Sequence, residues 1–184
     1  SMNDWTINSI SGIPVGWTVV DNGDEGDSES EGTGYESEYL TFDIKSDGNI
    51  TWIKGSSATA KTISYSKNDG EWVNITSTTS GVSISVVTGD KVRFKGSNSA
   101  YSESNSYDYA NSFGGTARFD AYGNIMSLIG GDDFSNLTTL SSYYTFLGVF
   151  YNCTGLLSAE NLILPATTLV SNCYYYMFQG CTIS

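Results

Sequence analysis

The residues best suited to chemistry in this chain are carboxylates, and six of them fall in the eleven positions from Asp21 to Glu31. Closely spaced carboxylates are the ligands that Ca²⁺ requires. Compared with a twelve-residue calcium loop, however, glycine occupies two of the ligand positions, 3 and 12. We therefore predict an acidic linker over residues 21–38, mobile and metal-free from 21 to 36, with a calcium site as the alternative. The ligands of that alternative site would be Asp21, Asp24, Glu25 and Asp27.

Histidine is absent from the sequence, which limits the catalytic chemistry that the chain can offer. Ser-His-Asp triads, Cys-His pairs and histidine-based zinc sites are all excluded. Acids such as Asp132, Asp133 and Glu160 could serve a glycosidase, but nothing in the sequence fixes the separation of about 5–10 Å that such a reaction needs. We predict no catalytic residues and no cofactor.

The segment from 96 to 113 has the composition of a binding loop, being rich in Tyr, Ser, Asn and Gly. Tyrosine supplies rigid amphipathic contact area, and the small polar residues adapt their hydrogen bonds to a ligand. A loop of this length without structure of its own is often functional. Tyr101, Tyr107 and Tyr109 are therefore candidate binding residues. The alternative is that they only cover the edge of the fold.

The charge of the chain restricts its partners. The net charge is −12, and only eight residues are Lys or Arg. Because nucleic acids and anionic membranes bind basic surfaces, neither is an expected partner. No run of about 18 apolar residues is present, so we expect no membrane-spanning segment.

The elements that must position these residues are β-strands. From residue 39 to about residue 130, apolar and polar side chains alternate and are interrupted by turns, as in a β-sandwich of seven or eight strands. The clearest hairpin covers residues 61–76, around Asn68-Asp69-Gly70. We predict an N-terminal strand segment at 1–20, the acidic linker at 21–38, the sandwich at 39–130 and a repeat segment at 131–184.

The repeat segment contains two copies of one pattern, 28 to 29 residues apart. Leu137-Thr-Thr-Leu leads to Phe150-Tyr-Asn-Cys-Thr, and Ala166-Thr-Thr-Leu leads to Phe178-Gln-Gly-Cys-Thr. This spacing is typical of a solenoid repeat. Equivalent cysteines on stacked coils point in parallel, so we favour buried thiols over a disulfide. The predicted repeat core consists of Leu162, Leu164, Leu169, Phe150, Phe178, Cys153 and Cys181.

These leucines and the Phe-x-x-Cys-Thr signature resemble the BspA-like (Treponema-type) leucine-rich repeats of bacterial surface proteins. The stretches around Tyr39, Tyr65, Gly89 and Gly123 are also similar to the β-domain that precedes such repeats in surface proteins of gut anaerobes. The resemblance implies a mainly β protein, with a β-sandwich-like domain followed by the first coils of a leucine-rich-repeat solenoid. It also implies an exported protein at the bacterial cell surface, and it carries no catalytic residues.

We therefore expect a non-catalytic recognition or adhesion module that binds an extracellular glycan or protein. The alternatives are a structural N-terminal cap or stalk of a longer repeat protein and a glycan-active enzyme. Each coil of a solenoid needs a neighbour to bury its open face. The second copy lacks the leucines that follow the first, so we expect an open end through which the chain self-associates.

Overall fold

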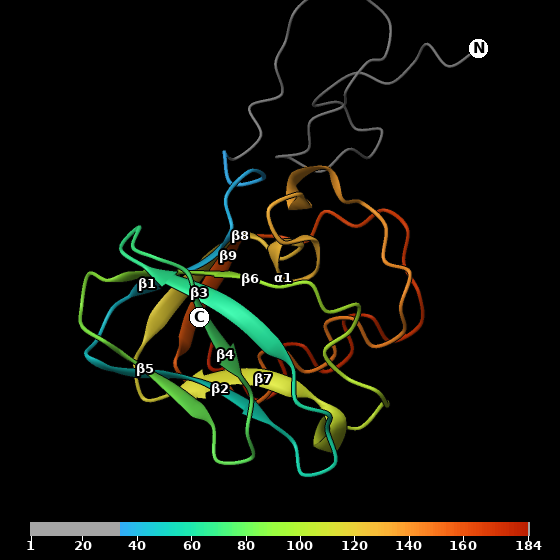
Figure 1. Ribbon diagram of the computed structural model, residues 1–184, viewed down its shortest axis with the longest axis horizontal. Helices are drawn as coiled ribbons and strands as arrows, with labels where there is room; N and C mark the ends of the chain where they lie inside the picture. The colour runs from blue at the N-terminus through green and yellow to red at the C-terminus, as the bar shows by residue number, and fades with distance from the viewer. Residues whose placement is uncertain (1–33, 184) are drawn as a thin grey trace, which may run out of the picture. The chain divides into compact units, whose positions relative to one another are not determined.

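The computed structural model describes residues 34–183, which form two packed β-sheets with coiled layers beside them (Figure 1). The prediction of a mainly β protein is confirmed. The predicted strand segment at 1–20 and the candidate calcium ligands Asp21, Asp24, Glu25 and Asp27 lie outside the described residues. So does all of the predicted acidic linker except residues 34–38.

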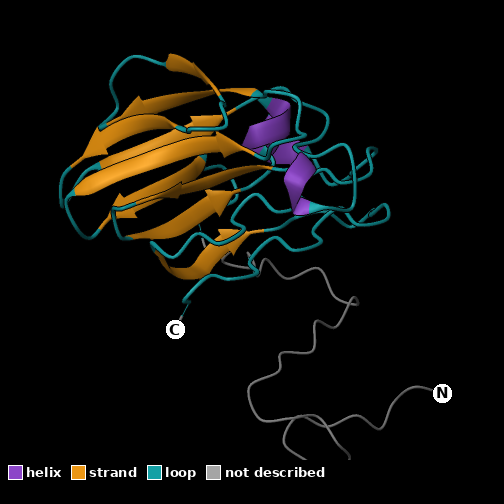
Figure 2. Cartoon of the chain, turned by 90° about the horizontal axis from the view of Figure 1, so that it is seen from below, coloured by secondary structure: helices purple, strands orange, loops and turns teal. Residues whose placement is uncertain are grey.

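The larger sheet has the strand order β4-β3-β6-β1-β8-β9 and the smaller one the order β5-β2-β7. All pairs are antiparallel except β8 with β9. The only helices in the described part are the short α1, η1 and η2, which lie with the loops on one side of the strands (Figure 2). The elements are β1 (Leu40–Ile44), β2 (Gly48–Lys54), β3 (Thr62–Lys67), β4 (Val73–Thr76), β5 (Val82–Val86), β6 (Lys91–Lys95), η1 (Tyr107–Tyr109), β7 (Asn111–Gly115), β8 (Phe119–Asn124), α1 (Ser127–Gly130), η2 (Phe134–Asn136) and β9 (Leu156–Ile163).

Strand β9 shows how the two parts of the sequence are combined. It comes from the leucine-spaced stretch of the repeat segment, yet it pairs in parallel with β8 at the edge of the larger sheet. Leu156 is opposite Phe119 and is fully buried. The repeat segment therefore contributes a strand to the same sheet as the predicted sandwich.

An aromatic core lies between the two sheets, because the alternating pattern turns one face of each strand inward. Phe42 of β1 lies at its centre, with its ring centroid 4.1 Å from that of Phe119 and 4.9 Å from that of Phe113. Trp52 of β2 packs on Phe113 at 4.8 Å and donates its indole N–H to the carbonyl of Lys61 at 2.8 Å. These rings are essentially inaccessible to solvent.

The two repeat copies run side by side as two layers, seen as the orange and red coils in Figure 1. The amides of Phe146, Gly148, Phe150 and Asn152 donate to carbonyls 27 residues ahead, at 2.7–3.1 Å. Each layer also holds its own turns by bonds from an amide to the carbonyl three residues earlier. The rings follow the same register, with Phe150 stacked on Phe178 at 5.6 Å and 8°.

The predicted repeat core is only partly buried. Phe150 and Cys153 are fully buried, whereas Leu162, Phe178 and Cys181 are half-buried. Leu164 and Leu169, which the repeat predicts in the same core, are instead 42% and 56% exposed. The physical reason is that the first copy covers only one side of the last layer. No described residue covers its other side.

The three cysteines are free thiols. Cys181 donates its S–H to the carbonyl of Phe150 at 2.9 Å, and burial raises the pKa of the Cys153 thiol to about 12. A thiol with so high a pKa stays protonated and acts as a small hydrophobic side chain. This agrees with the interpretation of Cys153 and Cys181 as parts of a stacked interior.

Gly123 of β8 allows the start of the described chain to pack closely against this strand. Its φ is +86°, and a Cβ atom there would collide with the carbonyl oxygen of Tyr39. We expect Gly123→Ala to lower the free energy of unfolding by about 1–2 kcal/mol, because alanine is strained at this φ. The collision of the new Cβ atom should lower it by about 1–3 kcal/mol more. Chemical denaturation measures this loss. Gly89→Ala is the matched control, since Gly89 has φ +91° with open space around its Cβ position. Equal losses of unfolding free energy in the two variants would contradict an additional cost from the collision at Gly123.

Candidate functional site

The outer face of the larger sheet carries two rows of polar side chains that cross its strands. One row runs Ser66, Arg93, Thr41, Tyr122 and Asn161, each directly opposite the next in the strand register. The rows arise because side chains alternate between the two faces of a strand, and the apolar positions face the core. The second row runs Lys91, Asp43, Asp120 and Ser158.

Residues 34–38 form one wall above these rows. Asn124, which is almost fully buried, donates its backbone N–H to the carbonyl of Glu38 at 2.8 Å and its side-chain amide to that of Glu36 at 2.9 Å. Glu38 in turn donates its N–H to Tyr35 at 3.1 Å, which closes a turn. This turn brings Tyr35 against Tyr122 of β8, with ring centroids 5.1 Å apart and planes at 56°.

The sheet face and this wall enclose a groove of about 790 Å³, which we call the sheet groove. Its volume is in the range of ordinary ligand sites. Five acidic side chains and two basic ones line it, so its net charge is negative. The lining residues are Gly34, Tyr35, Glu38, Thr41, Asp43, Asp69, Lys91, Arg93, Asp120, Ala121, Tyr122, Ser158, Glu160 and Asn161.

The β6 side of the sheet groove is basic and held in place by several contacts. The Arg93 guanidinium pairs with Asp69 at 3.0 Å and donates to the Ser66 hydroxyl at 3.2 Å. It also lies over the ring of Trp72, 5.5 Å from the centroid, where a cation is attracted by the π-system. Its Nε is buried without a hydrogen-bond partner among the described residues.

The centre of the sheet groove contains a pair of carboxylates on neighbouring strands. Asp43 and Asp120 face each other in the register, and Lys45 joins them at 2.8 Å and 3.3 Å. Hydrogen bonding to Asp43 is the main cause of a raised pKa at Lys45, which therefore keeps its positive charge. The lysine compensates the repulsion that two like charges opposite each other would otherwise produce.

The β8–β9 side carries aromatic and acidic groups. Tyr122 lies opposite Asn161 in the register and beside the ring of Tyr35. Glu38 lines the groove from the wall, and Glu160 lines it from β9. Within residues 34–183, neither glutamate forms an ion pair.

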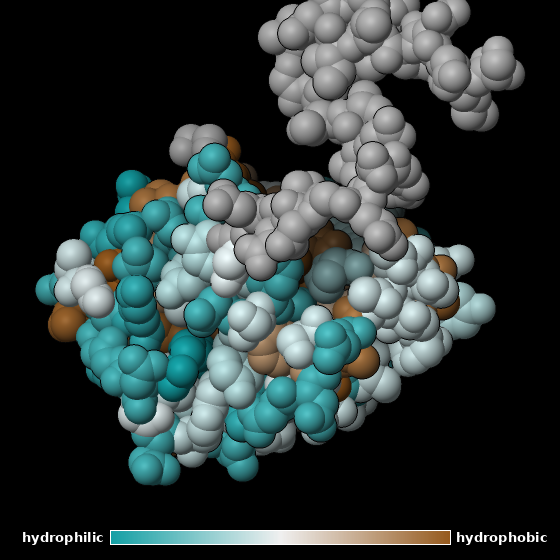
Figure 3. Space-filling view, turned by 90° about the horizontal axis from the view of Figure 1, so that it is seen from above, coloured by the Kyte–Doolittle hydropathy of each residue, from teal (hydrophilic) through white to brown (hydrophobic). Residues whose placement is uncertain are grey.

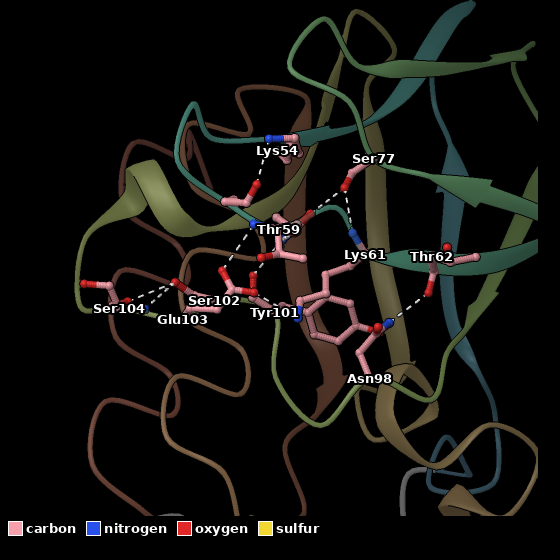
Figure 4. Close-up of polar contacts among 12 residues, drawn as sticks. Lys54, Thr59, Lys61, Thr62, Ser77, Asn98, Tyr101, Ser102, Glu103 and Ser104 are labelled. Atoms are coloured by element: carbon pink, nitrogen blue, oxygen red, sulfur yellow. Dashed lines mark hydrogen bonds and ion pairs between the residues drawn. The ribbon is translucent and has the colours of Figure 1, made fainter.

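The structure separates the three tyrosines predicted to bind a ligand. Tyr101 is fully buried and donates its hydroxyl to the carbonyl of Leu128, while Asn98 bonds to Tyr101 and to Thr62 (Figure 4). Desolvation by burial raises the pKa of Tyr101 far above its usual value. Tyr101 is thus a core residue that anchors the loop, a role that the sequence analysis did not consider.

Tyr107 and Tyr109 are exposed, at 48% and 38%, on the short helix η1. Tyr107 stacks on Tyr151 of the first layer, with centroids 4.7 Å apart. Neither lines the sheet groove. The structure therefore does not bring the predicted tyrosines together with the groove.

The acids considered for glycosidase chemistry are also divided. Asp132 accepts hydrogen bonds from Lys95 and Tyr39, both at 2.7 Å, and the bond from Lys95 is the main cause of its lowered pKa. Asp133 is exposed, and only Glu160 lines the groove.

Apart from Glu160, the residues of the sheet groove were not found from the sequence, although one signal pointed toward them. The polar residues that the strands contribute occupy outward positions, between the apolar residues that face the core. The alternation identifies them as outward-facing. It does not show that four strands and a distant turn bring them into one concave site.

Within residues 34–183, no three acidic or cysteine side chains are grouped so that they could hold a metal ion. None of the helices in this range is long and apolar enough to cross a membrane. No protein-family model matches the chain, and neither a curated protein nor a solved structure is significantly similar to it.

We expect Tyr101→Phe to lower the free energy of unfolding by about 1–3 kcal/mol, because the buried carbonyl of Leu128 would lose its donor. Urea denaturation measures the change. The control is Tyr109→Phe, which alters an exposed hydroxyl for which no hydrogen bond is seen within the described part. A loss at Tyr109 as large as that at Tyr101 would contradict the anchoring role.

Proposed function

We propose that this protein is a non-catalytic recognition module of the bacterial cell surface, and that it binds a glycan in the sheet groove. The observation that carries the proposal is the groove itself, where a tyrosine pair and a dense set of polar side chains line one concave face. The resemblance of the repeats to bacterial surface proteins and the strongly acidic chain support export.

The chemistry of the sheet groove suits a sugar. Carboxylates accept hydrogen bonds, guanidinium and ammonium groups donate them, and the amide of Asn161 does both. Sugar hydroxyls offer donors and acceptors in the same dense arrangement, and tyrosine rings pack against the C–H faces of a sugar. Outside the grey residues, the face of the molecule seen in Figure 3 is mostly hydrophilic, with hydrophobic side chains in small separate patches.

A binding role is supported over catalysis by the state of the central carboxylates. Asp43 and Asp120 both form an ion pair with Lys45 and are partly exposed, so neither lies in an apolar pocket. A glycosidase needs one carboxylic acid that stays protonated to assist the leaving group. The two central carboxylates thus supply hydrogen-bond acceptors rather than an acid catalyst.

A second candidate function, a structural start for a repeat array, is favoured by the last layer. In the first copy, the amides of Phe146, Gly148, Phe150 and Asn152 donate to the second copy. The equivalent amides of the second copy make no hydrogen bond within residues 34–183. These four amides belong to Tyr174, Tyr176, Phe178 and Gly180. A further layer offering carbonyl groups in the same register would satisfy them.

We expect Tyr122→Ala and Asn161→Ala each to weaken glycan binding at least about tenfold, since each removes a groove contact worth about 1.4 kcal/mol or more. A glycan array would identify a ligand, and titration calorimetry would measure the affinities. Tyr143→Ala is the control, because Tyr143 is 63% exposed and lies outside the groove. Unchanged affinity in both groove variants, with melting temperatures like that of the parent protein, would refute the site.

We also expect residues 1–184 to self-associate at high concentration through the uncovered last layer, because its free amides and the exposed Leu169 can be covered by a second copy. Sedimentation velocity over a concentration series measures this. Appending one further repeat unit should abolish the association. A strictly monomeric protein at high concentration would contradict the open-end prediction.

A further inference from the structure

We propose that the glycan bound in the sheet groove carries a free, protonated amino group, which lies on the β8–β9 side between Tyr35, Tyr122, Glu38 and Glu160. This inference rests on the proposed function and specifies the ligand class of the same site. The ligand class is an amino sugar that lacks its acetyl group.

The first step of the argument is the distribution of charge in the groove. On the β6 side, Arg93 is paired with Asp69, and Lys91 is a positive charge without an ion pair within residues 34–183. In the centre, Lys45 is shared by Asp43 and Asp120. On the β8–β9 side, Glu38 and Glu160 form no ion pair within residues 34–183. The unbalanced negative charge therefore lies at one end of the groove.

The second step is the presence of aromatic rings at the same end. Tyr35 and Tyr122 lie 5.1 Å apart with their planes tilted by 56°, and both line the groove. A ring face attracts a cation through its quadrupole, with a strength that grows when the site is shielded from water. Two tilted tyrosines, in a groove that is also lined by two glutamates without an ion pair within residues 34–183, form a set of groups that recognises an ammonium ion better than a neutral hydroxyl.

The third step is the exclusion of acidic ligands. Five carboxylates against two basic side chains give the groove a net negative charge, so its β8–β9 side disfavours sulfate, phosphate or uronic acid groups. A concave site lined mainly by one sign of charge also concentrates ligands of the opposite sign. The net charge of −12 on the whole chain acts in the same direction.

The fourth step is how the wall is held. The turn that carries Tyr35 and Glu38 is fixed to β8 by the two hydrogen bonds of Asn124, and the close approach at Gly123 lets it lie directly on the strand. The backbone that carries both groups of the wall is thereby fixed relative to Tyr122. A site whose groups are held in place loses less entropy on binding.

The test compares two ligands that differ only at the nitrogen, a β-1,4-linked glucosamine tetramer and the same tetramer fully N-acetylated. Titration calorimetry at about pH 6, below the pKa of an ordinary amine, would be run on the whole chain. We expect the free amine to bind at least about tenfold more tightly at low salt, and the advantage to shrink as the ionic strength rises.

Two double variants locate the effect. Glu38→Gln with Glu160→Gln should remove the preference for the amine and leave the affinity for the acetylated tetramer within about twofold. Glu71→Gln with Asp133→Asn is the control, since it removes the same total charge from exposed residues outside the groove. This control should keep the preference.

The possible outcomes separate this inference from the proposed function. If the acetylated tetramer binds as tightly as the free amine, the inference is overturned while glycan binding stands. If the control pair removes the preference as well as the groove pair does, the effect is one of total charge, and the assigned site is wrong. If neither tetramer nor any other glycan binds, the proposed function itself fails.

Discussion

The structure depends on one continuous aromatic core that is shared by the sheets and the repeat layers. Phe42 contacts both sheets, Phe113 of β7 stacks on Phe150 of the first layer at 5.7 Å, and Phe150 stacks on Phe178 at 5.6 Å. The backbones of β7 and the first layer are also joined, since Phe113 donates its N–H to the carbonyl of Val149 at 2.7 Å. The first layer thus closes one side of the core, and the sheets and layers stabilise each other.

This shared core determines where function can lie. The inner faces of the sheets are filled by aromatic side chains, and one side is covered by the layers, so a ligand of the described residues must bind on an outer face, and the groove lies on that of the larger sheet. Strand β9, which the repeat segment supplies, extends that face by one strand and brings Ser158, Glu160 and Asn161 to the groove. The repeat segment therefore helps to build the site as well as the core.

The groove and the last layer both contain polar groups without a partner among the described residues, but the groups differ in kind. In the groove, charged side chains remain hydrated and can exchange water for a ligand at modest cost. In the last layer, backbone amides are arranged at a fixed spacing and match only another backbone in the same register. The groove therefore suits a soluble ligand of varied chemistry, whereas the last layer suits a repeat unit or a second copy of the chain.

The sequence by itself determined the β-class, the 61–76 hairpin and the pairing of the two repeat copies, because these depend on local alternation, turn residues and a fixed period. It also indicated that Cys153 and Cys181 are thiols in stacked layers. Only the tertiary structure decided that Tyr101 is a core anchor, that Leu164 and Leu169 are exposed, and that β9 joins the sandwich sheet. It alone assembled the groove, since Glu38, Arg93, Tyr122 and Glu160 are brought together by strand order and register. These are set by long-range packing, which a local pattern of residues does not encode.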